Sequence, residues 1–257
     1  MLREKAIWYA SAICASLRIP SSPALAEKLM LYDDYDLGTM LDSTAHRLID
    51  HIPVDKTMEN IERVKIALKR TPSSKDLLAV GKTMQNTIDV NLKQCVERAL
   101  LAAAKEADVF KTKEVGNNSG PRVEMFLKSC GLGPGNPWCA AMVNWTLDQG
   151  DYPKGLIGGI QYRPATGRAA VRYWLAWAIQ NDLLVPIEKV QRGDLGLWVG
   201  ADGKGHMFWV PEAKKILGIW WIRTIEGNGN EEGSREGTKV VRKWRRCTSK
   251  YKFIRLW

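Results

Sequence analysis

The chain has 257 residues, 45% of them hydrophobic and 26% charged, and carries a formal net charge of +10 at pH 7. This composition is that of a globular protein and excludes the disordered, collagen-like and coiled-coil classes. No apolar run reaches the ~18 residues that a membrane-spanning helix requires.

The charged residues and the tryptophans are unevenly divided along the chain. Residues 1–110 hold 15 basic and 15 acidic side chains, whereas residues 111–257 hold 23 basic and 13 acidic ones together with ten of the eleven Trp. Such a change predicts two units with different roles. The basic unit suits an anionic or polymeric partner, such as nucleic acid, a cell-wall polymer or a membrane surface, and its charge does not choose among them.

The first 26 residues combine a short charged start, an apolar stretch over residues 6–17 and the sequence Ala24-Leu25-Ala26. This is the layout of a secretory signal peptide with its cleavage site. The alternative is an N-terminal helix over about residues 4–17 that ends at Pro20 and Pro23.

The pattern in residues 24–110 predicts an all-helical region. Apolar residues recur at three- and four-residue spacing over residues 25–31, 37–52, 57–70, 74–80 and 86–109. His46 and His51 are five residues apart, which does not place them on one helix face as a metal pair would need. We expect the domain boundary between residues 94 and 95, and the pattern does not indicate a role for residues 1–94.

Beyond residue 111 the pattern predicts three further helices and then a series of strands. Helices are expected over residues 121–130, 137–149 and 168–181. Short β-type runs then follow between glycine-rich turns, at residues 194–199, 206–210, 219–225, 238–244 and 251–256. This order indicates an α+β fold in which helices pack on an antiparallel sheet.

Cys139 lies in a segment that suits a nucleophile. The five cysteines form no CxxC pair, so neither a zinc site nor a disulfide scaffold is indicated. Asn136 is a good N-cap, Pro137 suits the first helical position and Gly150 the C′ position, so Cys139 is expected as the third helical residue. The helix dipole there lowers a thiol pKa, and backbone N–H groups without an acceptor can bind an oxyanion. The alternative is a small buried hydrophobic side chain.

A thiol nucleophile needs a histidine base, and His206 is the only histidine after residue 51. A third group should orient its imidazole. Glu226 and Asn228 share one face of the next predicted strand and are the candidates. Asp194 is the other nearby acid and ranks below Glu226, because Gly-Asp before a strand usually belongs to a turn. The alternative for His206 is a structural histidine at a strand edge.

The pairing of the two strands decides whether these groups meet. A hairpin centred on Ile216 would place Glu226 opposite His206. One centred at residues 214–215 would shift the pairing by three residues and place Arg223 there instead. The predicted constellation therefore requires the first register or a β-bulge.

Several short segments occur in one order within residues 95–257: Lys-Glu-Val-Gly-Asn-Asn-Ser-Gly-Pro at 113–121, Pro-Trp-Cys-Ala-Ala at 137–141, Gly-Asp-Leu at 193–195, Gly-His at 205–206, Thr-Ile-Glu-Gly-Asn at 224–228, Gly-Ser-Arg-Glu-Gly at 233–237 and Phe-Ile-Arg-Leu at 253–256. With them this part of the chain resembles the CHAP (cysteine, histidine-dependent amidohydrolase/peptidase) domains, in the papain-like NlpC/P60 group of peptidoglycan hydrolases. The last two segments are similar to the branch found in phage endolysins and related bacterial proteins. The resemblance does not cover residues 1–90.

The resemblance implies a papain-like fold and hydrolysis of a peptidoglycan amide bond, without a metal or cofactor, at the bacterial cell wall. By this resemblance, Cys139 is the nucleophile, His206 is the base and Glu226 is the group that orients the base, with Asn228 as a helper. The expected substrate contacts are Glu114, Asn118, Asn136 and Trp138. The partner would be peptidoglycan, reached by export, by phage lysis or by a secretion machine, and the bond cut is either the N-acetylmuramoyl-L-alanine amide or a peptide bond.

Two other functions stay open. An inactive CHAP fold could serve a phage or secretion particle as a structural or binding component, with the helical N-terminal region binding a protein partner. Alternatively, residues 239–255, which hold eight Lys/Arg and no acid, could bind nucleic acid, with Trp244 and Tyr251 stacking on bases. Alternating basic and apolar residues more often form an edge strand with a solvated basic face, so we expect no nucleic-acid partner.

Overall fold

The computed structural model describes residues 74–157, 160–230 and 237–257. The signal-peptide layout, the predicted helices before residue 74, and His46 and His51 lie outside the described residues. Contacts divide the chain into two compact units, residues 1–91 with 156–160 and residues 92–155 with 161–257. The elements that concern the candidate site all belong to the second unit.

The long helix α5 (Ser74–Asp108) is continuous, whereas the sequence pattern predicted two helices separated by residues 81–85. The predicted gap contains Gly81, and one glycine inside a helix costs only about 1 kcal/mol relative to alanine. Within residues 74–157, 160–230 and 237–257, α5 and the other helices all fall short of the length and apolarity needed to cross a membrane.

Three shorter helices follow: α6 (Pro121–Ser129), α7 (Cys139–Gln149) and α8 (Val171–Gln180). Gly150 is the C-cap of α7 with a φ of −89°, and the left-handed residue after it is Asp151, so the predicted C′ role of Gly150 is wrong. The glycine is instead required by close packing. A Cβ at Gly150 would lie 2.7 Å from the backbone nitrogen of Ala99 in α5.

The main sheet has six strands in the order β3-β8-β4-β5-β6-β7, with every neighbouring pair antiparallel. This confirms the predicted α+β class with an antiparallel sheet. Its strands are β3 (Leu184–Val185), β4 (Asp194–Val199), β5 (Gly205–Ile216), β6 (Ile219–Gly229), β7 (Lys239–Arg246) and β8 (Lys252–Ile254). The short strand β3 was not predicted. A 3-10 turn (Ile187–Lys189) and a separate two-stranded sheet, β1 (Leu156–Ile157) with β2 (Ile160–Gln161), complete the described elements.

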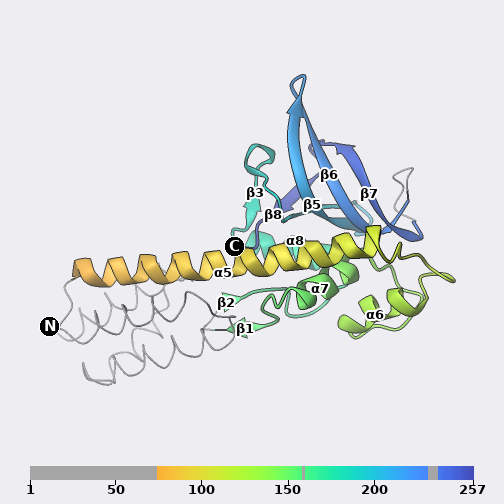
Figure 1. The fold of residues 1–257 in the computed structure, drawn as a ribbon, viewed down its shortest axis with the longest axis horizontal. Helices are drawn as coiled ribbons and strands as arrows, with labels where there is room; N and C mark the ends of the chain where they lie inside the picture. Colours follow the sequence, from red (N-terminus) through yellow and green to blue (C-terminus); the bar gives the residue numbers. More distant parts are fainter. Residues whose placement is uncertain (1–73, 158–159, 231–236) are drawn as a thin grey trace. The chain divides into compact units, whose positions relative to one another are not determined.

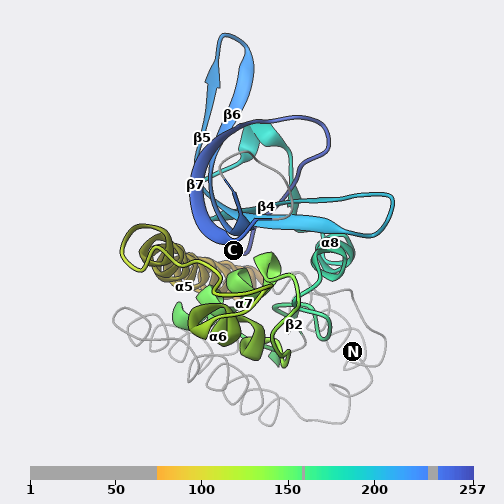
Figure 2. The same ribbon diagram turned by 90° about the vertical axis from the view of Figure 1, so that its right-hand side faces the viewer.

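The six-stranded sheet is strongly curled, and its two faces have different neighbours (Figure 2). Helix α7 packs against β5 and β6, and α8 packs against β4 and β5. Trp209 in β5 faces α7, where its Nε1 donates to Thr146 Oγ1 at 2.9 Å. The next side chain back, Phe208, points to the other face, because side chains alternate along a strand. It joins a buried cluster with Val210, Ile222, Tyr251 and Phe253.

Strands β5 and β6 form a long hairpin that projects from the sheet (Figure 1). Its turn is Leu217-Gly218, with φ angles of +48° and +81°, and Ile216 pairs with Ile219. Two left-handed residues are typical of the type I′ turn, whose twist matches that of the strands. Both predicted hairpin centres, Ile216 and residues 214–215, are therefore wrong, because the chain reverses at Gly218, where a positive φ is unstrained.

A β-bulge in this hairpin decides which side chains share a face. The register shifts by one residue between Trp209 and Glu212. The shifted stretch contains Pro211, which lacks an N–H group and suits a bulge. A one-residue shift moves a strand's side chains to the opposite face, so without it His206 and Glu226 would lie on different faces. The bulge, which the sequence-based argument allowed as an alternative, places both on the same face.

Candidate active site

Cys139 begins helix α7, so it is the first helical residue rather than the predicted third. Trp138 is the N-cap, and the predicted cap, Asn136, instead donates its Nδ2 to Gly133 O at 3.0 Å. Asn228 Oδ1, in β6, takes the place of the Asn136 side chain and accepts from the Trp138 N–H at 3.1 Å. Cys139 nevertheless lies in the first turn, where the N–H groups have no acceptor within the helix.

Cys139, His206 and Glu226 are brought together in the interior, with exposed fractions of 4%, 2% and 0%. His206 Nε2 lies 2.9 Å from Glu226 Oε2 and donates to it, since an ionised carboxylate can only accept. His206 Nδ1 is buried and has no hydrogen-bond partner at ordinary distance among the described residues. Besides Glu226, the imidazole interacts electrostatically with the Cys139 thiol. Nδ1 is therefore the nitrogen left to exchange a proton with this thiol.

The pKa values of Cys139 and His206 are displaced in opposite directions. Burial raises the pKa of the Cys139 thiol, but its interaction with His206 and the N–H groups of Met207 and Ala140 outweigh this, so the net pKa is lowered. Burial lowers the pKa of His206, but the interactions with Cys139 and Glu226 raise it overall to about 9. These shifts favour a thiolate–imidazolium pair at neutral pH, which is the reactive form of a cysteine nucleophile.

Several groups besides His206 bind the carboxylate of Glu226. Arg245 donates Nε to Oε1 and Nη2 to Oε2, both at 2.6 Å, and Thr224 Oγ1 also donates to Oε1. Lys243 Nζ lies 3.6 Å from Oε2. Burial raises the pKa of Glu226, but Arg245 and His206 together bring it well below its ordinary value. Glu226 therefore stays ionised beside the imidazole.

Thr224, Lys243 and Arg245 were not identified from the sequence. The basic residues of β7 were expected on a solvated face of an edge strand. β7 does end the six-stranded sheet, but the side chains of Lys243 and Arg245 are only 14% and 13% exposed. The signal in the sequence was the two-residue period of a strand, which places Thr224 and Glu226 on one face of β6. Lys243 lies beside them because it pairs with Thr224. A carboxylate buried on one strand requires cations or donors from its neighbours.

Asn228, the predicted helper, has a φ of +54° and holds the start of α7. Besides accepting from the Trp138 N–H, its Nδ2 donates to Gly237 O at 2.5 Å and to Glu114 Oε1 at 3.5 Å. It makes no hydrogen bond to His206 among the described residues. The glycine before it allows a close approach, because a Cβ at Gly227 would lie 2.8 Å from the Trp138 ring.

The four predicted substrate contacts separate into two groups. Trp138 is fully buried and donates its Nε1 to Glu114 Oε1 at 2.7 Å, and Glu114 Oε2 accepts from the Asn118 N–H at 3.1 Å. Trp138 and Glu114 therefore stabilise the segment before Cys139. Asn118 and Asn136 are half-buried, and their loops meet where Gly135 N donates to Asn118 O at 2.9 Å. These two side chains keep access to solvent.

Asp194 closes the predicted turn, where its N–H donates to Gln191 O at 3.2 Å, and it is also the first residue of β4. It is buried, accepts two hydrogen bonds from Arg255 at 3.1 and 2.9 Å, and accepts from the Gln191 N–H at 2.8 Å. Its strand partner is Val210. Asp194 therefore anchors the C-terminal segment and contributes nothing to the imidazole.

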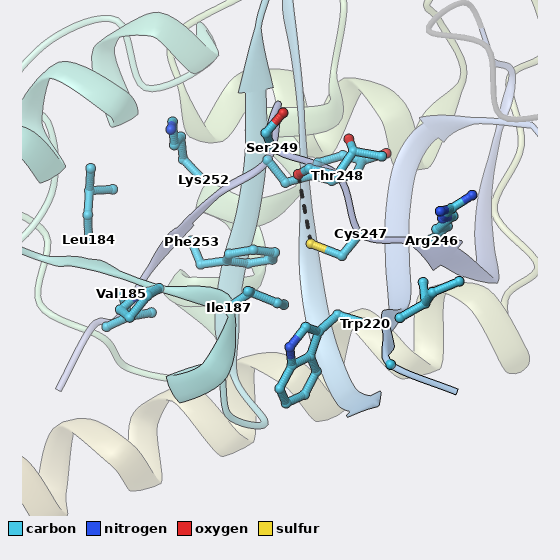
Figure 3. A pocket seen from close by; sticks show the side chains of 14 residues that line it. Leu184, Val185, Ile187, Trp220, Arg246, Cys247, Thr248, Ser249, Lys252 and Phe253 are labelled. Carbon is cyan, nitrogen blue, oxygen red and sulfur yellow. Dashed lines mark hydrogen bonds between the residues drawn. The ribbon is translucent and has the colours of Figure 1, made fainter. Parts of the chain in front are cut away.

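A separate pocket of about 580 Å³ opens beside the hairpin turn and the end of β7 (Figure 3). None of the predicted site residues lines it. Its wall is mainly apolar, with Arg246 and Lys252 as its charged members, and includes Tyr251 and Phe253 from the cluster around Phe208. It is therefore distinct from the Cys139 site.

Comparisons with protein-family models, curated proteins and solved structures found no match.

Proposed function

We propose that the chain is a cysteine hydrolase with a papain-like CHAP domain that cleaves an amide bond in peptidoglycan. The observation that carries the proposal is the buried row of Cys139, His206 and Glu226, in which a cysteine at a helix N-terminus is matched with an imidazole of raised pKa. Its support from the sequence is the ordered set of CHAP-like segments and the positive charge of residues 111–257, which suits an anionic wall polymer.

The reaction divides into two acyl transfers. The Cys139 thiolate attacks the amide carbonyl carbon, and the resulting oxyanion accepts from the Cys139 backbone N–H, which has no acceptor within the helix. His206 Nδ1 passes its proton to the leaving amine as the C–N bond breaks, which leaves a thioester on Cys139. Water, giving its proton to His206, then attacks the thioester and releases the carboxylic acid and the thiolate.

Hydrolysis is expected to follow a bell-shaped pH profile. As the pH rises through about 9, His206 loses the proton that must pass to the leaving amine, so the rate falls. As the pH falls through the lowered pKa of Cys139, the thiolate is protonated and the rate falls again. Initial rates of amine release in a series of buffers check this, and a rate that still climbs well above pH 9 would contradict it.

The proposed function is tested by digestion of purified peptidoglycan. Mass spectrometry of the released fragments is expected to show new free amines at one kind of amide bond, with no new reducing sugar ends. The identity of the fragments separates the N-acetylmuramoyl-L-alanine amide from a peptide bond. If the fully folded protein releases neither amines nor fragments, the hydrolase proposal is wrong and the structural or binding role takes its place.

A further inference from the structure

The carboxylate of Glu226 is fixed by a fork of two hydrogen bonds from one side chain. Arg245 uses Nε for Oε1 and Nη2 for Oε2, each at 2.6 Å, while Thr224 shares Oε1 and His206 shares Oε2. Rotation of the carboxylate about its last bond would break the two arginine bonds and the histidine bond together. Planar bidentate pairing of this kind imposes an orientation, which a single point charge does not.

Lys243 is a competitor for the same carboxylate. Its Nζ lies 3.6 Å from Oε2, the oxygen that accepts from His206, and donates to Asn230 O at 2.6 Å. If Arg245 were absent, Lys243 would be the cation left beside Glu226, apart from the His206 imidazolium, among the described residues, and would draw this oxygen away from the imidazole.

The Arg245 guanidinium is itself held in place. Its side chain is 13% exposed, and its carbon lies 6.0 Å from the centre of the Phe208 ring. Tyr251 also interacts electrostatically with it. Arg245 is thus supported by the buried cluster of β5 and the C-terminal segment, rather than ordered by Glu226 alone.

We propose that Arg245 is a positioning residue, which holds the Glu226 carboxylate so that Oε2 stays on His206 and the Cys139–His206 pair stays ionised. This inference rests on the proposed function in taking Cys139 as the nucleophile. It goes further in assigning the orientation of the acid to a residue of the edge strand, which the sequence pattern had placed on a solvated face.

The test is the pH dependence of Cys139 alkylation by iodoacetamide, with the modified cysteine located by mass spectrometry. Both Arg245→Met and Arg245→Lys are expected to raise the apparent pKa of the Cys139 thiol by about one unit, which leaves roughly tenfold less thiolate at pH values below it. Lysine keeps the charge but not the fork, so a pure charge effect would leave Arg245→Lys like the parent. Arg246→Met, the same change at an exposed position of β7, should leave the profile unchanged. Parent-like profiles for either Arg245 variant would overturn the proposal.

A double substitution separates positioning from a fold defect. If Arg245 acts through Glu226, then Glu226→Gln and Glu226→Gln/Arg245→Met should have the same alkylation profile. A further shift in the double variant would show that Arg245 acts by another route and would overturn the inference. Alkylation needs no peptidoglycan, so a raised thiol pKa in a protein that releases no amines would leave Arg245 as proposed and reject the hydrolase function.

Discussion

Replacing Cys139 with alanine is expected to lower the rate of amine release from peptidoglycan by about five to six orders of magnitude, as loss of a nucleophile does in comparable hydrolases. The reason is that the remaining parts of the site, His206 and the free N–H at the start of α7, cannot form the thioester. The folded state should persist, since the change removes one sulfur atom from a site that is 4% exposed. Fragments quantified by mass spectrometry give the rate.

Cys130→Ala is the matched control, because it deletes the same atom from the same unit. Burial raises the pKa of Cys130, so its thiol is protonated at neutral pH and should be dispensable. The pKa values of Cys95 and Cys247 are likewise raised by burial, which leaves Cys139 as the reactive thiol among the described cysteines. Amine release by Cys139→Ala at the rate of Cys130→Ala would reject the thiol mechanism.

Replacing Arg163 with methionine is expected to lower the free energy of unfolding by about 3–5 kcal/mol, the usual effect of removing one partner of a buried ion pair. Arg163 is fully buried and donates to Asp148 Oδ1 at 2.6 Å, to Asn144 Oδ1 at 3.0 Å and to the carbonyl oxygen of Tyr152. All three acceptors lie on α7 or just after it. Without the Arg163 guanidinium, these oxygen atoms lose a hydrogen-bond donor at the end of the helix that begins with Cys139.

Arg192→Met is the control for this substitution. Arg192 is half exposed and pairs with Glu97 at 3.0 Å, so its loss should cost less than about 1 kcal/mol, as for most surface ion pairs. Urea denaturation followed by tryptophan fluorescence gives both values. Equal stabilities for the two variants would mean that the Arg163 cluster does not stabilise the fold.

The parts of the fold that follow from local pattern were predicted well from the sequence. Strand β4 has the predicted bounds, Asp194–Val199, because a charged start, an apolar run and a following glycine-rich turn mark both of its ends. Helix α6 begins at the predicted Pro121 for a similar reason. The start of α7 was placed two residues early, because the group that binds the Trp138 N–H comes from Asn228, ninety residues away in the chain. Rules for helix capping consider only residues that are close together in the sequence.

The candidate site shows the same division between local and distant information. Cys139 and His206 could be selected because suitable residues are scarce and their local settings are distinctive. The role of Arg245 could not be assigned, since its contact with Glu226 depends on how β7 pairs with β6. The contact between His206 and Glu226 depends on a β-bulge whose position follows from the pairing of the whole hairpin. The sequence pattern therefore indicated that a bulge could be needed but did not indicate at which residue it occurs.

The bulge also separates the hairpin into two parts with independent registers. On the inner side the pairing is fixed by the need to keep His206 and Glu226 on one face, and on the outer side it is fixed only by the turn at Leu217-Gly218. Adding or removing one residue on each strand beyond the bulge would therefore lengthen or shorten the projecting end without turning any side chain of the site. The end of the hairpin, where Leu217 is 97% exposed, can vary in length and sequence while the arrangement of Cys139, His206 and Glu226 stays constant.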